Sequence, residues 1–501
     1  MIKTVLAKIV KFSRMNFGIL IICLSSFTLL LYRAKELMTG PHSFCNAFNA
    51  IMAQNYHDYG FLYSKFEPLI YNLAPYLQSF YLNHPPLFFI LVGVIFKITA
   101  SLFFVRIVII LFSVLAIYLY YVLVSNITQN KKIAISSAIF MGFSPMLLYY
   151  GKLINFEAVV LCLIIASCLL LASLKKNFSN HKLLALAFLL FVSALFDWPV
   201  TFLALIVSSY GLFFFKSKER LKIISISVIP IVADIAFVLY EKKFFGLTSL
   251  LGAGKMRMTY DILLSIDFWK VIETRCVTLF TPVVAVLSFL FVLSIFYKTV
   301  KGKKIKELLF NEQIYWVVAF FYLGLINILV FPYGAQIHEF WLYYFLPFFS
   351  LTAGIMISKI KEEIIILSIF VLFLFSSVIA YKDIYEWSSY QQAGIDNVVG
   401  YLNTNKIGKE YLFIGPPVLA YEVTNKTNVN GAYWSSFIVD LEKFKILKKE
   451  KEYAGVYFSY DFLETRESFN KNLVDTFGSG NFNIEYLDNE RMVKVNFLGV
   501  Q

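Results

Sequence analysis

A polar, aromatic-rich stretch near the N-terminus carries side chains that can bind a substrate. It runs from His42 to Gly60 and contains Asn46 and Asn49, and His84 follows it immediately before two prolines. A connector of this length, with histidine and amide side chains between aromatic residues, is suited to form a pocket against a membrane. We therefore predict that this stretch belongs to a catalytic face.

Carboxylates are scarce at this candidate face. The sequence contains no Asp or Glu from Leu37 to His57, and an amide such as Asn46 can orient a hydroxyl group but cannot act as a base at neutral pH. Glu157, at the start of a later apolar run, is the carboxylate that we predict to serve as the base or as a metal ligand. The alternative is that Glu157 only complements a helix N-terminus, an interaction worth roughly 0.3–1 kcal/mol.

Membrane-spanning helices must position these residues. Of the 501 residues, 59% are hydrophobic and 15% are charged, and the mean hydropathy is +0.70, which excludes a water-soluble globular protein. The fold class that we predict is an α-helical polytopic membrane protein. Apolar runs predict about eleven spans, at 16–32, 106–124, 133–150, 157–174, 183–197, 199–215, 223–240, 277–297, 314–331, 341–358 and 364–381.

The distribution of positive charge predicts the topology. The net charge is +13, but Lys and Arg lie in short clusters between apolar runs rather than on one face, so we expect no nucleic-acid partner. Placing the N-terminus in the cytoplasm puts most of these clusters on the cytoplasmic side. The apolar segment 86–98 is too short to span, and we predict an interfacial helix there, within an external loop at 33–105. The prediction is a multi-pass plasma-membrane protein with an extracytoplasmic C-terminus.

The composition changes near Asp383, which predicts two domains. Residues 1–382 form the membrane domain, and residues 383–501 are expected to form a small extracytoplasmic α/β domain. Its predicted strands lie at 411–415, 455–459, 483–486 and 492–497. Its predicted helices lie at 396–405 and 437–449.

Further substrate-binding candidates lie at the predicted outer ends of spans. A lone outer cation, such as the arginine that begins the second span, could hold a phosphate or simply extend to the interface. The aspartate before a Trp-Pro pair could bind substrate, or it could have only a structural role at the membrane interface. These candidates are Arg106, Lys152, Asp197, His338 and Tyr344.

Together, these residues resemble the dolichyl-phosphate-mannose protein mannosyltransferase-like membrane glycosyltransferases, a family 39-type group. The resemblance covers roughly residues 1–385. It implies the C-type glycosyltransferase fold and transfer of a sugar from a polyprenyl-phosphate carrier to a lipid, glycan or protein acceptor on the outer face of the membrane. Many relatives have a carboxylate in the first loop, where this chain has Asn46 or Asn49. The matching residues are His42, Asn46-Ala47, Ala53-Gln-Asn-Tyr56, Tyr59-Gly60, His84-Pro-Pro-Leu87, Arg106, Ser144-Pro145, Tyr150-Gly-Lys152, Glu157, Asp197-Trp-Pro199 and His338-Glu-(x)3-Tyr-Tyr344.

Two other functions fit parts of the sequence. A transporter or flippase for a lipid-linked saccharide is favoured by Asp234 inside an apolar run, and a catalytically inactive binder is favoured by the missing first-loop carboxylate.

No cofactor is required by a motif. A divalent cation could bind external carboxylates, but no ligand spacing demands one. The enzyme hypothesis predicts that one cavity at the outer membrane boundary gathers the side chains of His42, Asn46, His84, Arg106, Glu157 and His338.

Overall fold

The computed structural model describes residues 2–35, 40–71, 79–301, 310–433, 453–459, 465–487, 489 and 492–498. Two compact units make up the chain. The first, here called the membrane unit, comprises Met1–Lys35, Leu82–Phe88 and Ser101–Lys382. The second, here called the sheet unit, comprises Glu36–Tyr81, Phe89–Ala100 and Asp383–Gln501. Most of the predicted first loop therefore belongs with the C-terminal residues rather than with the spans.

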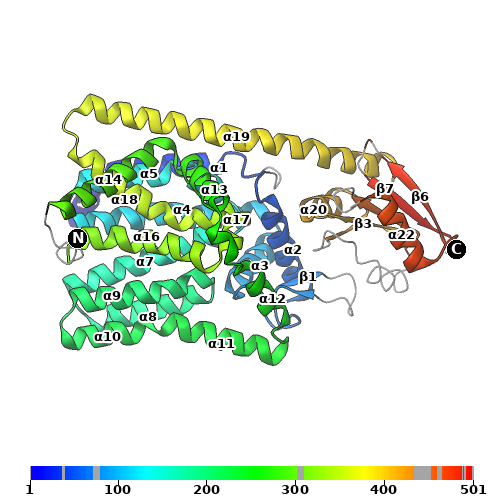
Figure 1. The fold of residues 1–501 in the computed structure, drawn as a ribbon, viewed down its shortest axis with the longest axis horizontal. Coiled ribbons are helices and arrows are strands. Elements are labelled where there is room, and N and C mark those ends of the chain that lie inside the picture. Colours follow the sequence, from blue (N-terminus) through cyan, green and yellow to red (C-terminus); the bar gives the residue numbers. More distant parts are fainter. Residues whose placement is uncertain are drawn as a thin grey trace. The chain divides into compact units, whose positions relative to one another are not determined.

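The membrane unit is built from helices (Figure 1). Its elements are α1 (Ile2–Leu31), α4 (Leu102–Thr128), α5 (Lys131–Gly142), α6 (Pro145–Tyr150), α7 (Phe156–Lys176), α8 (Asn180–Ala194), η1 (Trp198–Phe202), α9 (Leu203–Phe214), α10 (Ser217–Ser227), α11 (Ile229–Phe244), α12 (Thr248–Arg257), η2 (Asp261–Leu264), α13 (Ile266–Phe280), α14 (Pro282–Val300), α16 (Glu312–Val330), α17 (Pro332–Ile337), η3 (Glu339–Phe345) and α18 (Leu346–Lys359), with the first part of α19 (Glu363–Thr404).

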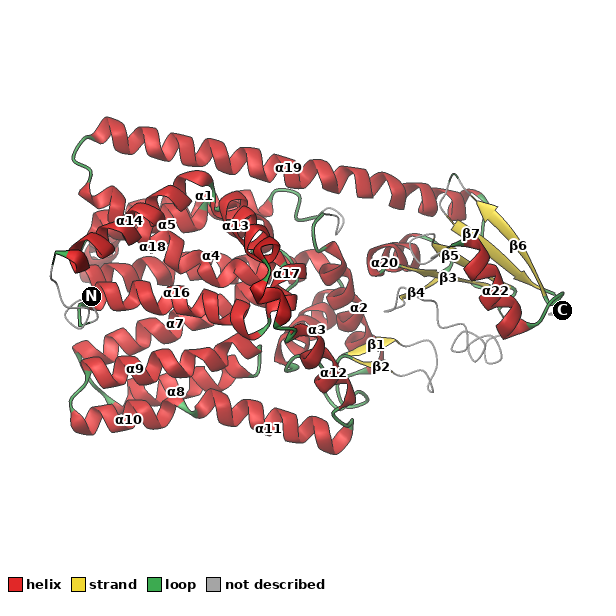
Figure 2. Ribbon diagram, viewed as in Figure 1, coloured by secondary structure: helices red, strands yellow, loops and turns green. Residues whose placement is uncertain are grey.

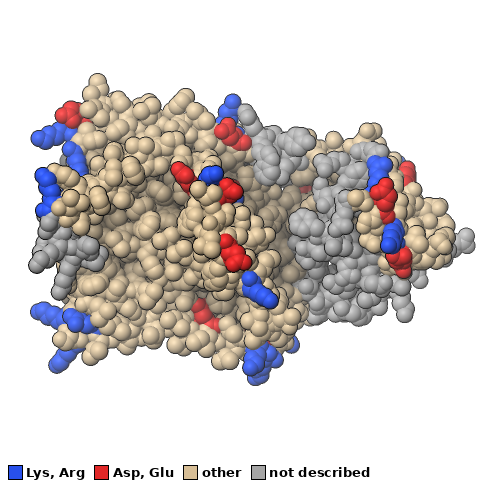
Figure 3. All heavy atoms as spheres, in the orientation of Figure 1, with Lys and Arg blue, Asp and Glu red and all other residues tan. Residues whose placement is uncertain are grey.

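Seven helical stretches of the described residues are long and apolar enough to cross a membrane. Each overlaps one of the predicted spans 106–124, 157–174, 223–240, 277–297, 314–331, 341–358 and 364–381. Shorter apolar helices at Phe17–Leu31, Asn180–Ala194 and Trp198–Phe214 occupy three more predicted spans. The face of this unit in Figure 3 has a broad band without charged side chains between two charged ends, as burial in lipid requires. The chain is therefore a polytopic membrane protein.

The predicted span 133–150 is two helices rather than one. α5 ends at Gly142 and α6 begins at Pro145, with Ser144 in an extended conformation between them. Proline lacks a backbone N–H and disfavours helical geometry in the residue before it, so the helix breaks at this point. The Ser144 hydroxyl donates to the carbonyl oxygen of Leu279 at 2.9 Å, and this bond fixes the break against α13.

Close helix packing forms the centre of the membrane unit. α5 packs against α18 and α4, and α4 packs against α7. Gly354 of α18 lies so near α5 that a Cβ atom there would collide with the side chain of Ser137. Small residues at such contacts allow helix backbones to approach closely where no hydrophobic effect drives association.

The sheet unit combines the first-loop elements with an α/β fold (Figure 2). Its elements are α2 (Ser43–Tyr59), β1 (Leu69–Tyr71), β2 (Ser79–Phe80), most of α3 (Leu87–Thr99), the end of α19, β3 (Tyr411–Gly415), α20 (Pro417–Lys426), β4 (Asn430–Tyr433), β5 (Gly455–Ser459), α22 (Arg466–Phe477), β6 (Phe482–Leu487) and β7 (Met492–Phe497). The helix α3 confirms a short helix in the predicted segment 86–98. Within this unit α2 packs against α20.

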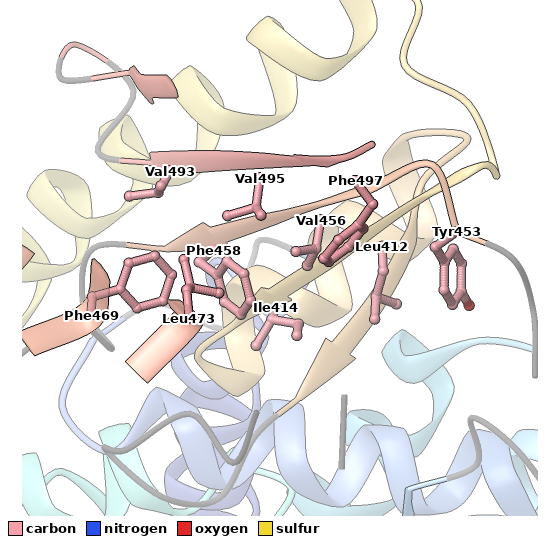
Figure 4. Packing of buried hydrophobic residues seen from close by; sticks show 10 residues of the cluster. All are labelled: Leu412, Ile414, Tyr453, Val456, Phe458, Phe469, Leu473, Val493, Val495 and Phe497. Carbon is pink, nitrogen blue, oxygen red and sulfur yellow. The ribbon is translucent and has the colours of Figure 1, made fainter. Parts of the chain in front are cut away.

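The main sheet has five strands in the order β4-β3-β5-β7-β6. β4, β3 and β5 are parallel, whereas β7 is antiparallel to both β5 and β6. One face is apolar and buries Val456, Phe458, Val493 and Val495 with residues of α22 (Figure 4). The other face packs residues such as Phe413 against α19 and α20.

The sequence located four of the five strands of this sheet. The four predicted strands correspond to β3, β5, β6 and β7, and the predicted helix 396–405 is the end of the long helix α19. The predicted helix 437–449 lies outside the described residues. β4, α20 and α22 were not predicted, since each is short and weakly periodic.

Candidate functional site

A cavity of about 430 Å³ lies in the membrane unit. Segments far apart in the sequence line it, because α7, η1, α12, α16 and η3 all contribute residues. Much of the lining is apolar, with a small set of charged and hydrogen-bonding groups, as is usual for ligand sites. The lining residues are Asn83, His84, Glu157, Asp197, Trp198, Pro199, Leu250, Leu251, Ala253, Gly254, Lys255, Arg257, Met258, Asn327, Phe331, Trp341 and Tyr344.

His84 lies between an acidic and a basic side chain of this lining, Asp197 and Arg257. Its Nδ1 lies 2.7 Å from Oδ1 of Asp197, and its Nε2 lies 3.3 Å from Nη1 of Arg257. The imidazole also stacks on Phe156, with ring centroids 4.7 Å apart and an interplanar angle of 20°. A carboxylate, an imidazole and a guanidinium thus form one hydrogen-bonded row along the cavity.

The partners of His84 determine its protonation state. Arginine has no acceptor atom, so Nε2 must accept from Arg257, and the ring proton must lie on Nδ1, which donates to Asp197. The imidazole is therefore neutral. Burial lowers the pKa of His84, an effect that Asp197 opposes and the Arg257 charge reinforces, which agrees with the neutral ring.

Asp197 is positioned by its place at the start of η1. Its Oδ1 accepts from the backbone N–H of Trp198 at 2.9 Å as well as from His84. The Trp198 indole donates to the carbonyl oxygen of Asn83 at 2.8 Å, which connects η1 to the segment that carries His84. Asp197 is 3% exposed, and the hydrogen bonds from Trp198 and His84 both go to its Oδ1.

Glu157 lies in the first turn of α7 and is 3% exposed. A carboxylate at this position is favoured by the partial positive charge of the helix N-terminus. Glu157 and Asp197 both line the cavity, so two buried carboxylates approach one space. A pair of this kind is suited to acid–base chemistry.

Tyr344 presents a buried hydroxyl group to this space. Its residue is 1% exposed, and within the described residues its hydroxyl has no hydrogen-bond partner. Beside it in η3, the indole of Trp341 lies 5.9 Å from the guanidinium carbon of Arg257. Trp341 also lies against Gly334, where a Cβ atom would collide with the indole ring.

A polar cluster holds η3 in place. Glu339, the first residue of η3, accepts a hydrogen bond from the hydroxyl of Tyr150, and its other oxygen lies 3.7 Å from Nε of Arg275. Arg275 in turn donates to the carbonyl oxygen of Ala335 at 2.8 Å. These contacts fix the segment that carries Trp341.

Several predicted residues have other surroundings and do not line this cavity. Nζ of Lys152 donates to the carbonyl oxygen of Tyr32 and to the hydroxyl of Tyr381, both at 2.8 Å. Arg106 donates to the carbonyl oxygen of Ala34 at 3.0 Å. His338 stacks on Phe340, with ring centroids 4.9 Å apart. The predicted gathering around one cavity therefore includes His84 and Glu157 but not Arg106 or His338.

The first-loop candidates belong to helix α2 in the sheet unit. His42 precedes α2 with a left-handed backbone (φ 57°), and Asn46 and Asn49 are 1% and 4% exposed. The helix is fixed to the rest of the loop by Asn55, whose side-chain amide donates to the carbonyl oxygen of Leu69 at 2.7 Å. The roles predicted for His42, Asn46 and Asn49 stay predictions.

The described residues contain no group of three or more His, Cys, Asp or Glu side chains that could hold a metal ion.

No protein-family model and no curated protein matches the chain. Solved structures do. ArnT from Cupriavidus metallidurans bound to undecaprenyl phosphate is 10% identical, with a TM-score of 0.59 over 97% of this chain and 99% of that one. The apo structure of the same ArnT is also 10% identical, with a TM-score of 0.59 over 96% of this chain and 98% of that one. The chain has the C-type glycosyltransferase fold. This confirms the predicted fold class, whereas membership of the mannosyltransferase family stays a prediction.

The site residues predicted from the sequence did not include Arg257, Asn83 or Asn327. A polar side chain within an apolar span can be recognised from the sequence as a candidate site residue. Asn327 is such a residue, since it lies in α16 and is 2% exposed. Nothing local distinguishes Arg257 from Lys255, because its partners His84 and Trp341 lie far away in the sequence.

Proposed function

We propose that this protein is a membrane glycosyltransferase that moves a sugar from a polyprenyl-phosphate carrier to a lipid, glycan or protein acceptor at the outer face of the membrane. The observation that carries the proposal is the cavity, where Glu157 and Asp197 share a space with Arg257 in a C-type glycosyltransferase fold. ArnT, which has the same fold, was crystallised with undecaprenyl phosphate, and this supports a polyprenyl-phosphate carrier for the present chain.

Arg257 and Lys255 suit the phosphate of the donor. Both line the cavity from α12, and a guanidinium binds phosphate oxygens through charge-assisted hydrogen bonds. When the sugar leaves its carrier, the C1–O bond breaks and its electrons stay on the phosphate, so a cation here stabilises the leaving group. Trp341 and neutral His84 hold Arg257 without neutralising its charge.

Glu157 and Asp197 suit the acceptor side of the reaction. A hydroxyl oxygen of the acceptor attacks C1 of the sugar, and its proton passes to a carboxylate. Glu157 is our candidate for this base, because Oδ1 of Asp197 already accepts two hydrogen bonds. Asp197 and the Tyr344 hydroxyl are then available to orient the sugar or the acceptor.

The first test is sugar transfer by the purified protein in lipid, with a panel of radiolabelled polyprenyl-phosphate sugars and membrane extract as acceptor. Glu157→Gln should reduce transfer by about 10²–10⁴-fold while the protein stays folded. Glu312→Gln is the matched control, since Glu312 also lies in the first turn of a helix but does not line the cavity. Wild-type turnover by Glu157→Gln would remove Glu157 from the reaction.

A catalytically inactive binder of lipid-linked sugars is the second candidate function. It is favoured by helix α2, whose buried polar side chains include the amides Asn46 and Asn49, while its carboxylate Asp58 is exposed at the helix end. Saturable binding of the carrier without transfer to any acceptor would support this function over the enzyme.

A further inference from the structure

The two faces of the main sheet differ in one region of the C-terminal α/β fold. The face packed on α22 is apolar, whereas the opposite face changes from apolar to polar between β5 and β7. The strand register places Tyr457, Lys494 and Glu485 side by side on this second face. The neighbouring row on the same face runs from Tyr411 through Gly455 and Asn496 to Asn483.

Gly455 lets an aromatic ring lie on the sheet. A Cβ atom at this position would be 2.7 Å from Cε1 of Tyr411 and 2.6 Å from the carbonyl oxygen of Val495. The Tyr411 ring therefore occupies the space that a side chain on β5 would take. Its hydroxyl reaches across to β7, where it donates to Oδ1 of Asn496 at 3.4 Å. The ring of this half-buried tyrosine is a flat apolar surface beside polar groups.

Tyr457 adds a hydroxyl group that the described part of the chain leaves without a hydrogen-bond partner. The residue is fully buried, and its ring centroid lies 5.4 Å from that of Tyr411. Nζ of Lys494 lies 5.4 Å from the centroid of the Tyr411 ring and 5.8 Å from that of the Tyr457 ring. Burial raises the pKa of Tyr457, so the hydroxyl stays protonated and can donate. A buried donor without a partner costs free energy unless a ligand or water satisfies it.

The charges at this place balance. Lys494 of β7 lies opposite Glu485 of β6, so a cation and an anion are neighbours and the remaining polar groups are amides and hydroxyls. A phosphate or a nucleic acid would meet Glu485, and a cationic ligand would meet Lys494. A neutral ligand with hydroxyl groups meets donors and acceptors of both kinds, and its C–H face can pack on the Tyr411 ring.

We propose that Tyr411, Tyr457, Lys494, Glu485 and Asn496 form a binding site for a neutral saccharide ring. The C–H face of the sugar packs on Tyr411, and its hydroxyl groups bond to the Lys494 ammonium, the Glu485 carboxylate and the Asn496 amide. The Lys494 side chain is flexible and half-exposed, and it turns aside so that the sugar reaches the Tyr457 hydroxyl. The site requires no catalysis, so it is independent of the reaction proposed above.

The test is saturation-transfer NMR on the full chain in a detergent without a sugar headgroup. The probes are the methyl glycosides of glucose, galactose, mannose and N-acetylglucosamine. At least one should receive saturation from the wild type, and Tyr411→Ala should weaken its binding about tenfold. Tyr411→Phe, which keeps the ring, should bind within a few-fold of the wild type. Tyr486→Ala is the control, since Tyr486 is also in the sheet but on the face that packs on α22.

A substitution at one of the polar residues of the site provides a second test. If Tyr411→Ala does not fold, Asn496→Ala removes one half-buried amide without changing the buried core, and it should still weaken binding several-fold. The proposal is overturned if no probe binds, or if binding is unchanged in Asn496→Ala, and in Tyr411→Ala where that variant folds, but lost in Asp197→Asn. The last result would place the sugar in the membrane-unit cavity, and would leave the proposed transfer reaction standing.

Discussion

The membrane-unit cavity and helix α2 both carry buried polar side chains, but the chemistry of the two sets differs. The cavity contains the carboxylates Glu157 and Asp197, each 3% exposed, whereas α2 buries the amides Asn46, Asn49 and Asn55. A carboxylate can accept a proton from an attacking hydroxyl, and an amide cannot. The buried carboxylates of the cavity can therefore support acid–base chemistry, whereas the buried amides of α2 can only form hydrogen bonds.

The largest predicted effect tests this division directly. Asp197→Asn keeps an oxygen that can accept from His84 and from the Trp198 N–H, but it removes the negative charge. Because the charge of Asp197 orients the sugar or the acceptor while Glu157 takes the proton, we expect kcat/KM for transfer to fall about 10²–10³-fold. Asn46→Ala should cost only about tenfold, mainly in KM, because it removes a hydrogen-bonding group. Steady-state kinetics on both variants measures the two effects.

The reverse order of these effects would contradict the comparison. If Asn46→Ala abolished turnover and Asp197→Asn left it intact, α2 would supply the group that the reaction depends on. Thermal unfolding of both variants is the control, since a loss of folded protein would lower both activities without separating them.

A second prediction uses two glycines of α12 to locate the substrate. A Cβ atom built at Gly252 or at Gly254 meets no atom within 4 Å, but of the two only Gly254 lines the cavity. Replacing either glycine by leucine favours the helix by about 0.8–1.0 kcal/mol. Gly254→Leu should also fill the cavity and raise KM for the donor roughly tenfold to a hundredfold.

Gly252→Leu is the matched control for this variant. It makes the same change two residues away in the same helix, so it should leave KM within about twofold of the wild type. Equal KM values for Gly252→Leu and Gly254→Leu would mean that the donor does not enter this cavity, and the carboxylates there would lose their proposed role.

The sequence predicted the fold better than the full site. Apolar runs of near-span length and clustered cations are local signals, so the spans and the strands β3, β5, β6 and β7 could be located from them. Glu157 and Asp197 were found because carboxylates at the ends of apolar runs are rare. The break at Ser144–Pro145 had a visible signal in the proline, which an average over the apolar run conceals.

Long-range partners explain what the sequence could not supply. Lys152 resembled an outer cation free for a phosphate, but its hydrogen-bond partners Tyr32 and Tyr381 lie 120 and 229 residues away. Arg257 is the opposite case: it was not predicted, yet it lines the cavity. Its contacts there are with His84 and Trp341, which come from distant segments. A charged residue gives the same local signal whether it anchors two helices or faces a cavity, and only the fold separates the two.

The smallest predicted effect is a change in how the free energy of unfolding depends on pH. Because the pKa of His84 is lowered in the folded protein, the unfolded chain takes up a proton that the folded chain does not as pH falls below about 6.5. The free energy of unfolding should therefore decrease with falling pH in that range, by at most about 1.4 kcal/mol per pH unit from this one group. His84→Gln should flatten this slope, and His181→Gln, at an exposed position of α8, should keep it. Thermal unfolding between about pH 7 and pH 5 measures the slopes. A wild-type slope in His84→Gln would mean that the protonated ring fits the cavity, and the neutral imidazole between Asp197 and Arg257 would have to be abandoned.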